Sequence, residues 1–151
     1  MYSDTVTVFN RYESSLGDTW YPTVIAGVDL NIDKAAILAK YGAESQDKAV
    51  LHIKYTKTDG GIYVAGKKWL SPKEWDRQTN DLLPKTITFT SEGEDSDFFM
   101  WGKYDTAPVS DADFDKYDGF YNYMLKKHDY VFTVSSAALY TVIPHFEILG
   151  R

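Results

Sequence analysis

Two glycines and a lysine nearly match the sequence motif of a phosphate-binding loop. Gly61, Gly66 and Lys67 fit the spacing G-x-x-x-x-G-K, in which backbone amides and a lysine surround phosphate groups. Lys68 stands where Ser or Thr would hold magnesium. The residues between the glycines, 62–65, favour a strand over a flexible loop. We therefore predict a hairpin here and no bound nucleotide.

A second near-match is to a calcium-binding loop. Asp111, Asp113 and Asp115 alternate as the first ligands of such a loop do, but Lys116 replaces the required glycine and Asn122 the bidentate glutamate. Acidic residues also favour the first turn of a helix, where they interact with its positive end. This segment is accordingly predicted to begin a helix, without a metal ion.

The sequence does not predict catalysis by a histidine or by a nucleophilic side chain. His52, His128 and His145 are far apart in the sequence, and none belongs to a Ser–His–Asp pattern. The chain has no cysteine, which excludes disulfides, zinc–thiolate sites and cysteine nucleophiles. We expect no enzymatic activity, no metal and no cofactor.

Acidic side chains gather in one part of the chain. Residues 92–118 carry nine acidic and two basic side chains, a net charge of −7, whereas the whole chain has −6. The pairs Glu92 with Glu94 and Asp95 with Asp97 are more simply explained by a charged loop than by acid–base catalysis. Since the chain has no basic stripe, sequence-specific binding to nucleic acid is not expected.

An apolar run lies inside these acidic surroundings: Phe98, Phe99, Met100 and Trp101. Core packing is the default interpretation of such a run. Aromatic residues and methionine are also enriched where partners dock, so the four residues are a candidate interface.

Alternating apolar and polar residues predict the elements that position these groups. We expect a hairpin of strands at 5–12 and 19–32, then strands at 49–56, 62–64, 68–70, 86–90, 130–134, 139–143 and 145–148. Ser71, Pro72 and Glu74 predict a short helix that ends near Thr79. A second helix is predicted from Ser110 to His128. Residues 33–41 fit either a helix or a strand.

These elements predict a mainly β (α+β) fold: a small barrel or sandwich of antiparallel strands with two short helical insertions. Residues 1–151 are expected to form a single domain, with an acidic, partly helical insertion at about 91–128. No apolar run approaches the ~18 residues that span a bilayer, and the polar N-terminus does not resemble a signal peptide. We therefore expect folding in a reducing cytoplasm and no membrane partner.

The order of several segments resembles a group of small phage proteins. Residues 5–12 (TVTVFNRY) and 20–28 (WYPTVIAGV) are similar to the opening strands of minor capsid, head-closure or head–tail connector proteins from siphophages and prophages of Gram-positive bacteria. Segments 34–47, 68–75, 130–136 and 146–150 resemble later elements of that group. The resemblance covers roughly residues 4–90 and 129–150, and residues 91–128 depart from it.

The resemblance implies a non-catalytic structural protein with a β-barrel-like fold. Its expected place is a ring in the neck, between the portal–adaptor complex and the tail. Expected partners are other neck and tail proteins, such as the portal, adaptor and tail terminator, and further copies of itself. Such a protein would be in the host cytoplasm during assembly and in the virion afterwards.

Acidic residues would suit a channel through which DNA slides, because like charges repel phosphates. The candidate channel-facing residues are Glu92, Glu94, Asp95 and Asp97. The alternative function is a carbohydrate- or protein-binding β-sandwich module, which would use Trp20, Trp69, Trp75 or Trp101.

Overall fold

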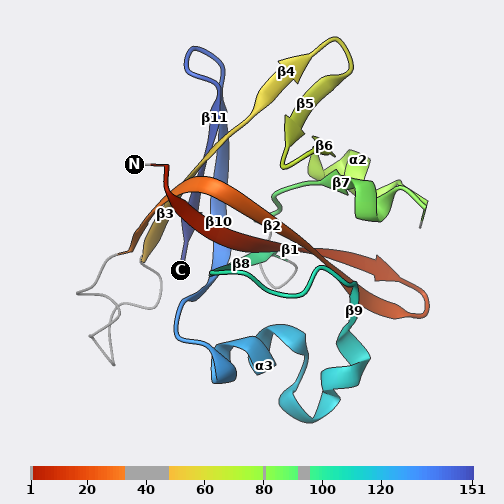
Figure 1. Ribbon diagram of the computed structural model, residues 1–151. Coiled ribbons are helices and arrows are strands. Elements are labelled where there is room, and N and C mark those ends of the chain that lie inside the picture. The colour runs from red at the N-terminus through yellow and green to blue at the C-terminus, as the bar shows by residue number, and fades with distance from the viewer. Residues whose placement is uncertain (1, 33–47, 80, 92–95) are drawn as a thin grey trace.

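Six antiparallel strands form a closed barrel in the computed structural model, which describes residues 2–32, 48–79, 81–91 and 96–151 (Figure 1). The strands run in the order β1–β8–β10–β11–β3–β2, and β2 pairs back with β1. Their bounds are β1 (Asp4–Ser14), β2 (Gly17–Ile32), β3 (Ala49–Lys54), β8 (Phe98–Trp101), β10 (Val131–Tyr140) and β11 (His145–Gly150). The predicted mainly β fold is confirmed as a barrel. The alternatives for residues 33–41 lie outside the described residues.

The long β1–β2 hairpin confirms the first sequence prediction. Its register runs from Asp4 opposite Val28 to Ser14 opposite Gly17, whose φ of 115° suits a glycine at the turn. Along β1, Val6 and Val8 pack in the barrel interior, whereas Phe9 points to the outer side. This alternation lets one strand contribute to two separate cores.

Strand β10 corrects the prediction for the C-terminal region. Residues 135–137 were expected to connect two strands, but they continue one strand from Val131 to Tyr140. The register shifts between Val134 and Ser136, as in a β-bulge, so the serines locally interrupt the pairing without ending the strand. The predicted strand at 139–143 is likewise wrong, because residues 141–144 form the turn before β11.

A smaller four-stranded sheet lies beside the barrel. It comprises β4 (Thr56–Thr58), β5 (Gly61–Val64), β6 (Lys67–Trp69) and β7 (Thr86–Ile87), with β6 and β7 parallel. Helix α2 (Pro72–Asp76) and the 3₁₀ helix η1 (Leu83–Lys85) connect β6 to β7. At the start of α2, the Ser71 amide and hydroxyl both donate to Glu74 Oε1, at 3.2 and 2.8 Å. The predicted helix start is confirmed, although the helix ends before Thr79.

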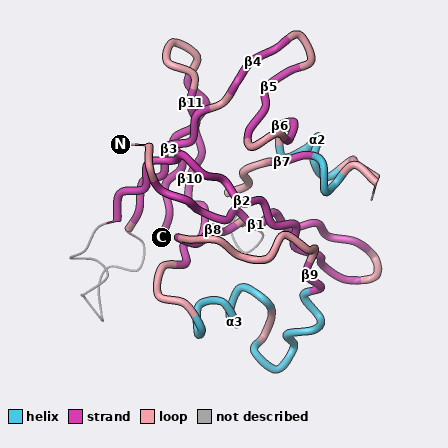
Figure 2. The backbone as a smooth tube through the Cα atoms, viewed as in Figure 1, coloured by secondary structure: helices cyan, strands magenta, loops and turns pink. Residues whose placement is uncertain are grey.

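The second predicted helix is two helices. Strand β9 (Val109–Ser110) pairs with β2, and the 3₁₀ helix η3 (Asp111–Tyr117) and helix α3 (Phe120–Lys127) follow. Asp118 and Gly119 have φ values of 61° and 113°, which no continuous helix can contain. Figure 2 shows helix in two parts of the molecule, at α2 beside the small sheet and at η3 and α3. No helix among the described residues is long and apolar enough to cross a membrane.

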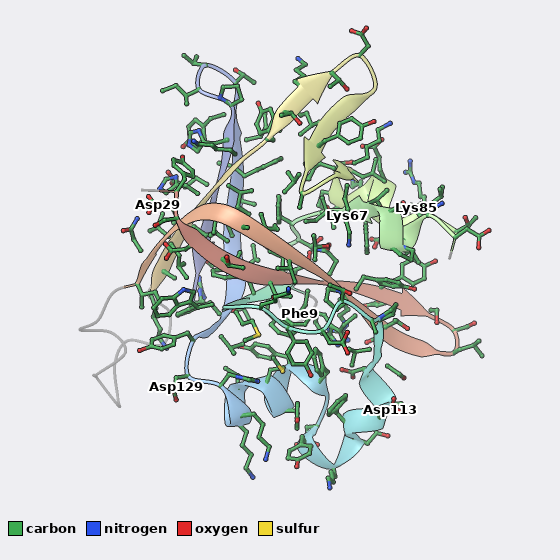
Figure 3. The ribbon with its side chains drawn as sticks, in the orientation of Figure 1. Phe9, Asp29, Lys67, Lys85, Asp113 and Asp129 are labelled. Carbon is green, nitrogen blue, oxygen red and sulfur yellow. The ribbon has the colours of Figure 1, made fainter. Side chains whose placement is uncertain are left out.

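Two hydrophobic cores stabilise this arrangement. The first fills the barrel and includes Leu51, Phe99 and Phe146. The second lies between the outer side of β1 and β8 and the helices η3 and α3, around Phe9 and Phe120 (Figure 3). The helical part of the segment that departs from the phage resemblance, residues 111–127, is therefore packed onto the barrel.

Candidate functional site

The β10–β11 hairpin projects beyond the barrel (Figure 1). The residues around its turn are apolar and exposed. Val142 is 96% exposed and Ile143 is 73% exposed, and Leu139 and Tyr140 beside them are also exposed. Turns are usually built from Gly, Pro, Asn, Asp and Ser. Contiguous exposed apolar side chains indicate an interaction site. We call these four residues the hairpin tip.

The hairpin tip is held in place by polar and aromatic contacts. The rings of Tyr140 and His145 stack with centroids 4.8 Å apart and planes 6° apart. His145 Nδ1 lies 2.7 Å from the Ile143 carbonyl oxygen, a distance at which the ring N–H donates to it. The Tyr55 hydroxyl donates to the Tyr140 carbonyl at 2.7 Å. A tip fixed in this way loses little conformational entropy when a partner binds.

A groove lies beside the same hairpin. Its volume is about 310 Å³, and its lining presents both apolar and polar groups: Trp69, Pro72, Phe89, Thr90, Ser91, Ala137, Ala138, Leu139 and Phe146. The Trp69 indole N–H is buried with no hydrogen-bond partner within the described part of the chain. A buried donor without an acceptor is costly, and this cost falls on the folded chain.

The apolar run is mostly core, which corrects the interface prediction. Phe98 and Phe99 are fully buried, and Met100 is 6% exposed. Strand β8 is short and central, so its side chains fill the barrel on one side and the second core on the other. Only Trp101 is exposed, and its ring contacts Tyr130 at a centroid distance of 5.1 Å.

The tryptophans do not form a carbohydrate platform. Trp20 and Trp75 are buried in the protein, and Trp69 packs against the barrel core. With Trp101 as the one exposed member of the four, the chain has no row of stacked tryptophans to present to a sugar.

Asp97 cannot face a channel, which corrects part of the acidic prediction. It is 1% exposed, and its carboxylate accepts hydrogen bonds at 2.9 Å from the amides of Arg11 and Thr90 and from Asn10 Nδ2. Burial raises the pKa of the Asp97 carboxyl to about 7, although these three donors oppose the shift. Glu92, Glu94 and Asp95 lie outside the described residues.

This raised pKa predicts a pH-dependent stability. Between about pH 4 and pH 7 the folded protein holds a proton on Asp97 that the unfolded chain has released, so the stability falls as the pH rises through this window. The slope is at most about 1.4 kcal/mol per pH unit. Urea unfolding at pH 5 and pH 8 should show that Asp97→Asn, which cannot titrate, costs more stability at pH 5. A larger cost at pH 8 would mean that the pKa is not raised.

The resemblance to a phosphate-binding loop is explained by a hairpin, as predicted. Val64 pairs with Lys67 across a turn at Ala65 and Gly66. Lys67 Nζ donates to Thr23 Oγ1 at 2.7 Å, and burial lowers the pKa of this lysine (Figure 3). The lysine therefore connects the small sheet to the barrel.

One of the three calcium-like aspartates, Asp111, has a structural role. Asp111 Oδ1 accepts hydrogen bonds from Trp20 Nε1 and from the Phe120 amide, both at 2.9 Å. It thereby joins the start of α3 to the barrel. Asp113 and Asp115 are exposed on η3.

The structure brings together two histidines that the sequence analysis treated as isolated. Glu147 lies opposite His52 in the β11–β3 register, and His145 lies two residues before Glu147 on the same outer face. One ligand atom from each of the three lies within 4.8 Å of the others. The H-x-E spacing of His145 and Glu147 in a strand was the available signal, whereas the contribution of His52 depends on the strand pairing.

Comparison with known proteins gives one match. No curated protein and no solved structure shows detectable similarity to the chain. A family model described as "Family of unknown function (DUF6751)" matches residues 1–151. Because the match covers every residue, the chain belongs to the DUF6751 family.

Proposed function

We propose that this chain is a non-catalytic structural protein of the head–tail junction of a tailed bacteriophage or prophage, forming part of a connector ring between portal–adaptor and tail. The segment resemblance supports this proposal, and so does the closed barrel. The observation that carries it is the hairpin tip, where Val142 and Ile143 are exposed at 96% and 73% on a projecting, internally braced hairpin.

A ring needs two different complementary surfaces on each copy, because a heterologous contact repeats around the axis. The hairpin tip supplies an apolar projection, and the groove of about 310 Å³ supplies a recess whose lining includes Trp69 and Phe146. In this proposal, the hairpin tip of one copy enters the groove of the next.

The channel wall and the cellular location are part of the same proposal. Glu92, Glu94 and Asp95 remain candidate channel-facing residues, without Asp97. The chain is in the host cytoplasm until heads are filled and then remains in the neck of the virion.

A double substitution of the hairpin tip should abolish tail attachment. Burying Val142 and Ile143 against the next copy contributes about 3 kcal/mol or more to the binding free energy, which is a factor of at least about 100 in affinity. The double variant Val142→Asp with Ile143→Asp removes this contribution. In a strain whose copy of the gene is deleted, this variant should leave filled heads without tails in electron micrographs. The wild-type gene should restore complete particles.

Leu16→Asp is the matched control, because Leu16 is 98% exposed at the turn of the β1–β2 hairpin. It should restore particles as the wild type does. The proposal would be contradicted if the double variant folded and still gave tailed particles, or if the deletion itself had no effect on particle assembly.

A further inference from the structure

We infer that His52, His145 and Glu147 form a binding site for a first-row transition metal ion, with Zn²⁺ as the expected occupant. The site lies on the outer face of the barrel, near the turn end of the β10–β11 hairpin, where His145 pairs with Tyr140. It goes beyond the proposed function and does not depend on it.

The strand geometry places the three side chains on one face. β3 and β11 are neighbouring strands, with His52 and Glu147 directly opposite each other, and all three residues are half-buried. Directly opposite residues on one face have Cβ atoms about 5 Å apart, and residues two apart on one strand share that face. The rings of His52 and His145 have centroids 5.5 Å apart.

The distances are close to those of a metal centre. Ligand atoms bound at 2.0–2.2 Å to a tetrahedral zinc ion lie about 3.4 Å from one another. The present ligand atoms lie within 4.8 Å of one another, so side-chain rotation has to bring them closer by about 1.4 Å at most. The backbone is fixed by the β3–β11 pairing and does not have to move.

His145 has a hydrogen-bond partner for one of its two ring nitrogens. Nδ1 lies 2.7 Å from the Ile143 carbonyl oxygen, and in the tautomer that donates this bond Nε2 is the nitrogen that can bind a metal ion. The stacked Tyr140 ring fixes the plane of the imidazole. Metal-bound histidines usually have this support from a carbonyl or carboxylate on the second ring nitrogen.

The donor set selects the type of ion. Two imidazole nitrogens and one carboxylate suit Zn²⁺ and its first-row neighbours, whereas Mg²⁺ and Ca²⁺ prefer oxygen ligands. Three protein ligands leave a fourth tetrahedral position for water or for a side chain of a docked protein. A bound ion would crosslink β3 to β11 and further fix the start of β11 beside the hairpin turn.

Isothermal titration calorimetry of the tag-free, EDTA-treated chain with ZnCl₂ tests the inference. We expect one Zn²⁺ per chain, and a loss of affinity of at least about tenfold in each of His52→Ala, His145→Ala and Glu147→Gln. His128→Ala is the matched control, because His128 lies at the end of α3 and outside the cluster; it should bind as the wild type does. MgCl₂ should give no comparable binding.

A second measurement does not rely on the folding of variants. Co²⁺ added to the wild-type chain should give the intense visible absorption of a tetrahedral nitrogen- and oxygen-ligated ion, and Zn²⁺ should displace it. The inference would be overturned by zinc binding that is unchanged in folded His52→Ala and His145→Ala, by binding lost equally in His128→Ala, or by the absence of stoichiometric binding to the wild type.

Discussion

Replacing Asp97 with alanine is expected to destabilise the folded chain by about 3 kcal/mol or more. The substitution removes the acceptor for three donors, the amides of Arg11 and Thr90 and the Asn10 side chain, in a region closed to water. Each buried donor left without an acceptor costs about 1–3 kcal/mol. The shift in the urea unfolding midpoint, at constant slope, measures the loss.

Asp113→Ala provides the comparison for this substitution, since Asp113 is an exposed aspartate on η3. It should change the stability by no more than about 0.5 kcal/mol. Equal effects of the two substitutions would show that Asp97 is not the hydrogen-bonding centre that joins β1, β8 and the segment after β7.

Gly150→Ala is expected to be the second strongly destabilising change, by about 3 kcal/mol. A Cβ atom at this position would lie 2.7 Å from Phe99 Cζ and 2.9 Å from Phe132 Cβ, inside the packed barrel. Phe132 Cβ is attached to the backbone of β10 and cannot rotate away. Overpacking of this kind costs about 1–3 kcal/mol, and more where the backbone must shift. Thermal unfolding followed by circular dichroism measures the effect.

Gly60→Ala is the matched control for overpacking. A Cβ atom there would lie 2.9 Å from the hydroxyl oxygen of Tyr63, at the end of a half-buried side chain that can move. We expect a change below about 1 kcal/mol. If Gly150→Ala were as mild as Gly60→Ala, the interior of the barrel would be less tightly packed than described.

Local patterns were sufficient to predict the elements whose sequence agrees with their surroundings. The alternation in β1 and β2, the turn at Gly66 and the Ser71–Glu74 capping pair each predicted what the structure contains. In these places the local preference and the tertiary contacts favour the same conformation.

Other features depend on contacts between residues far apart in the sequence. The two serines at 135 and 136 have the composition of a turn, yet pairing with β11 holds them in a strand with a bulge. The spacing of the apolar residues within 110–128 suggests one helix. Packing against Phe9 and Trp20 is instead achieved by two helices joined at Gly119.

In the candidate sites, too, the features that the sequence does not predict depend on contacts between residues far apart in the chain. The sequence around Asp97 resembles that of a charged surface loop, so Asp97 is predicted to be exposed. Nothing in that local sequence indicates the hydrogen bond from Asn10, which lies in the first strand of the barrel. His52 is separated from His145 by the small sheet and the helices, so only the β3–β11 pairing reveals the cluster. The exposed hairpin tip was hidden because Val142 and Ile143 have the composition of a strand.

Mass spectrometry of purified phage particles tests the central claim most directly. After induction of a strain that carries the gene, intact tailed particles should contain this chain in a constant ratio to the portal protein, through repeated gradient purification. A chain that is present in the lysate but absent from pure, tailed particles would contradict its assignment to the neck.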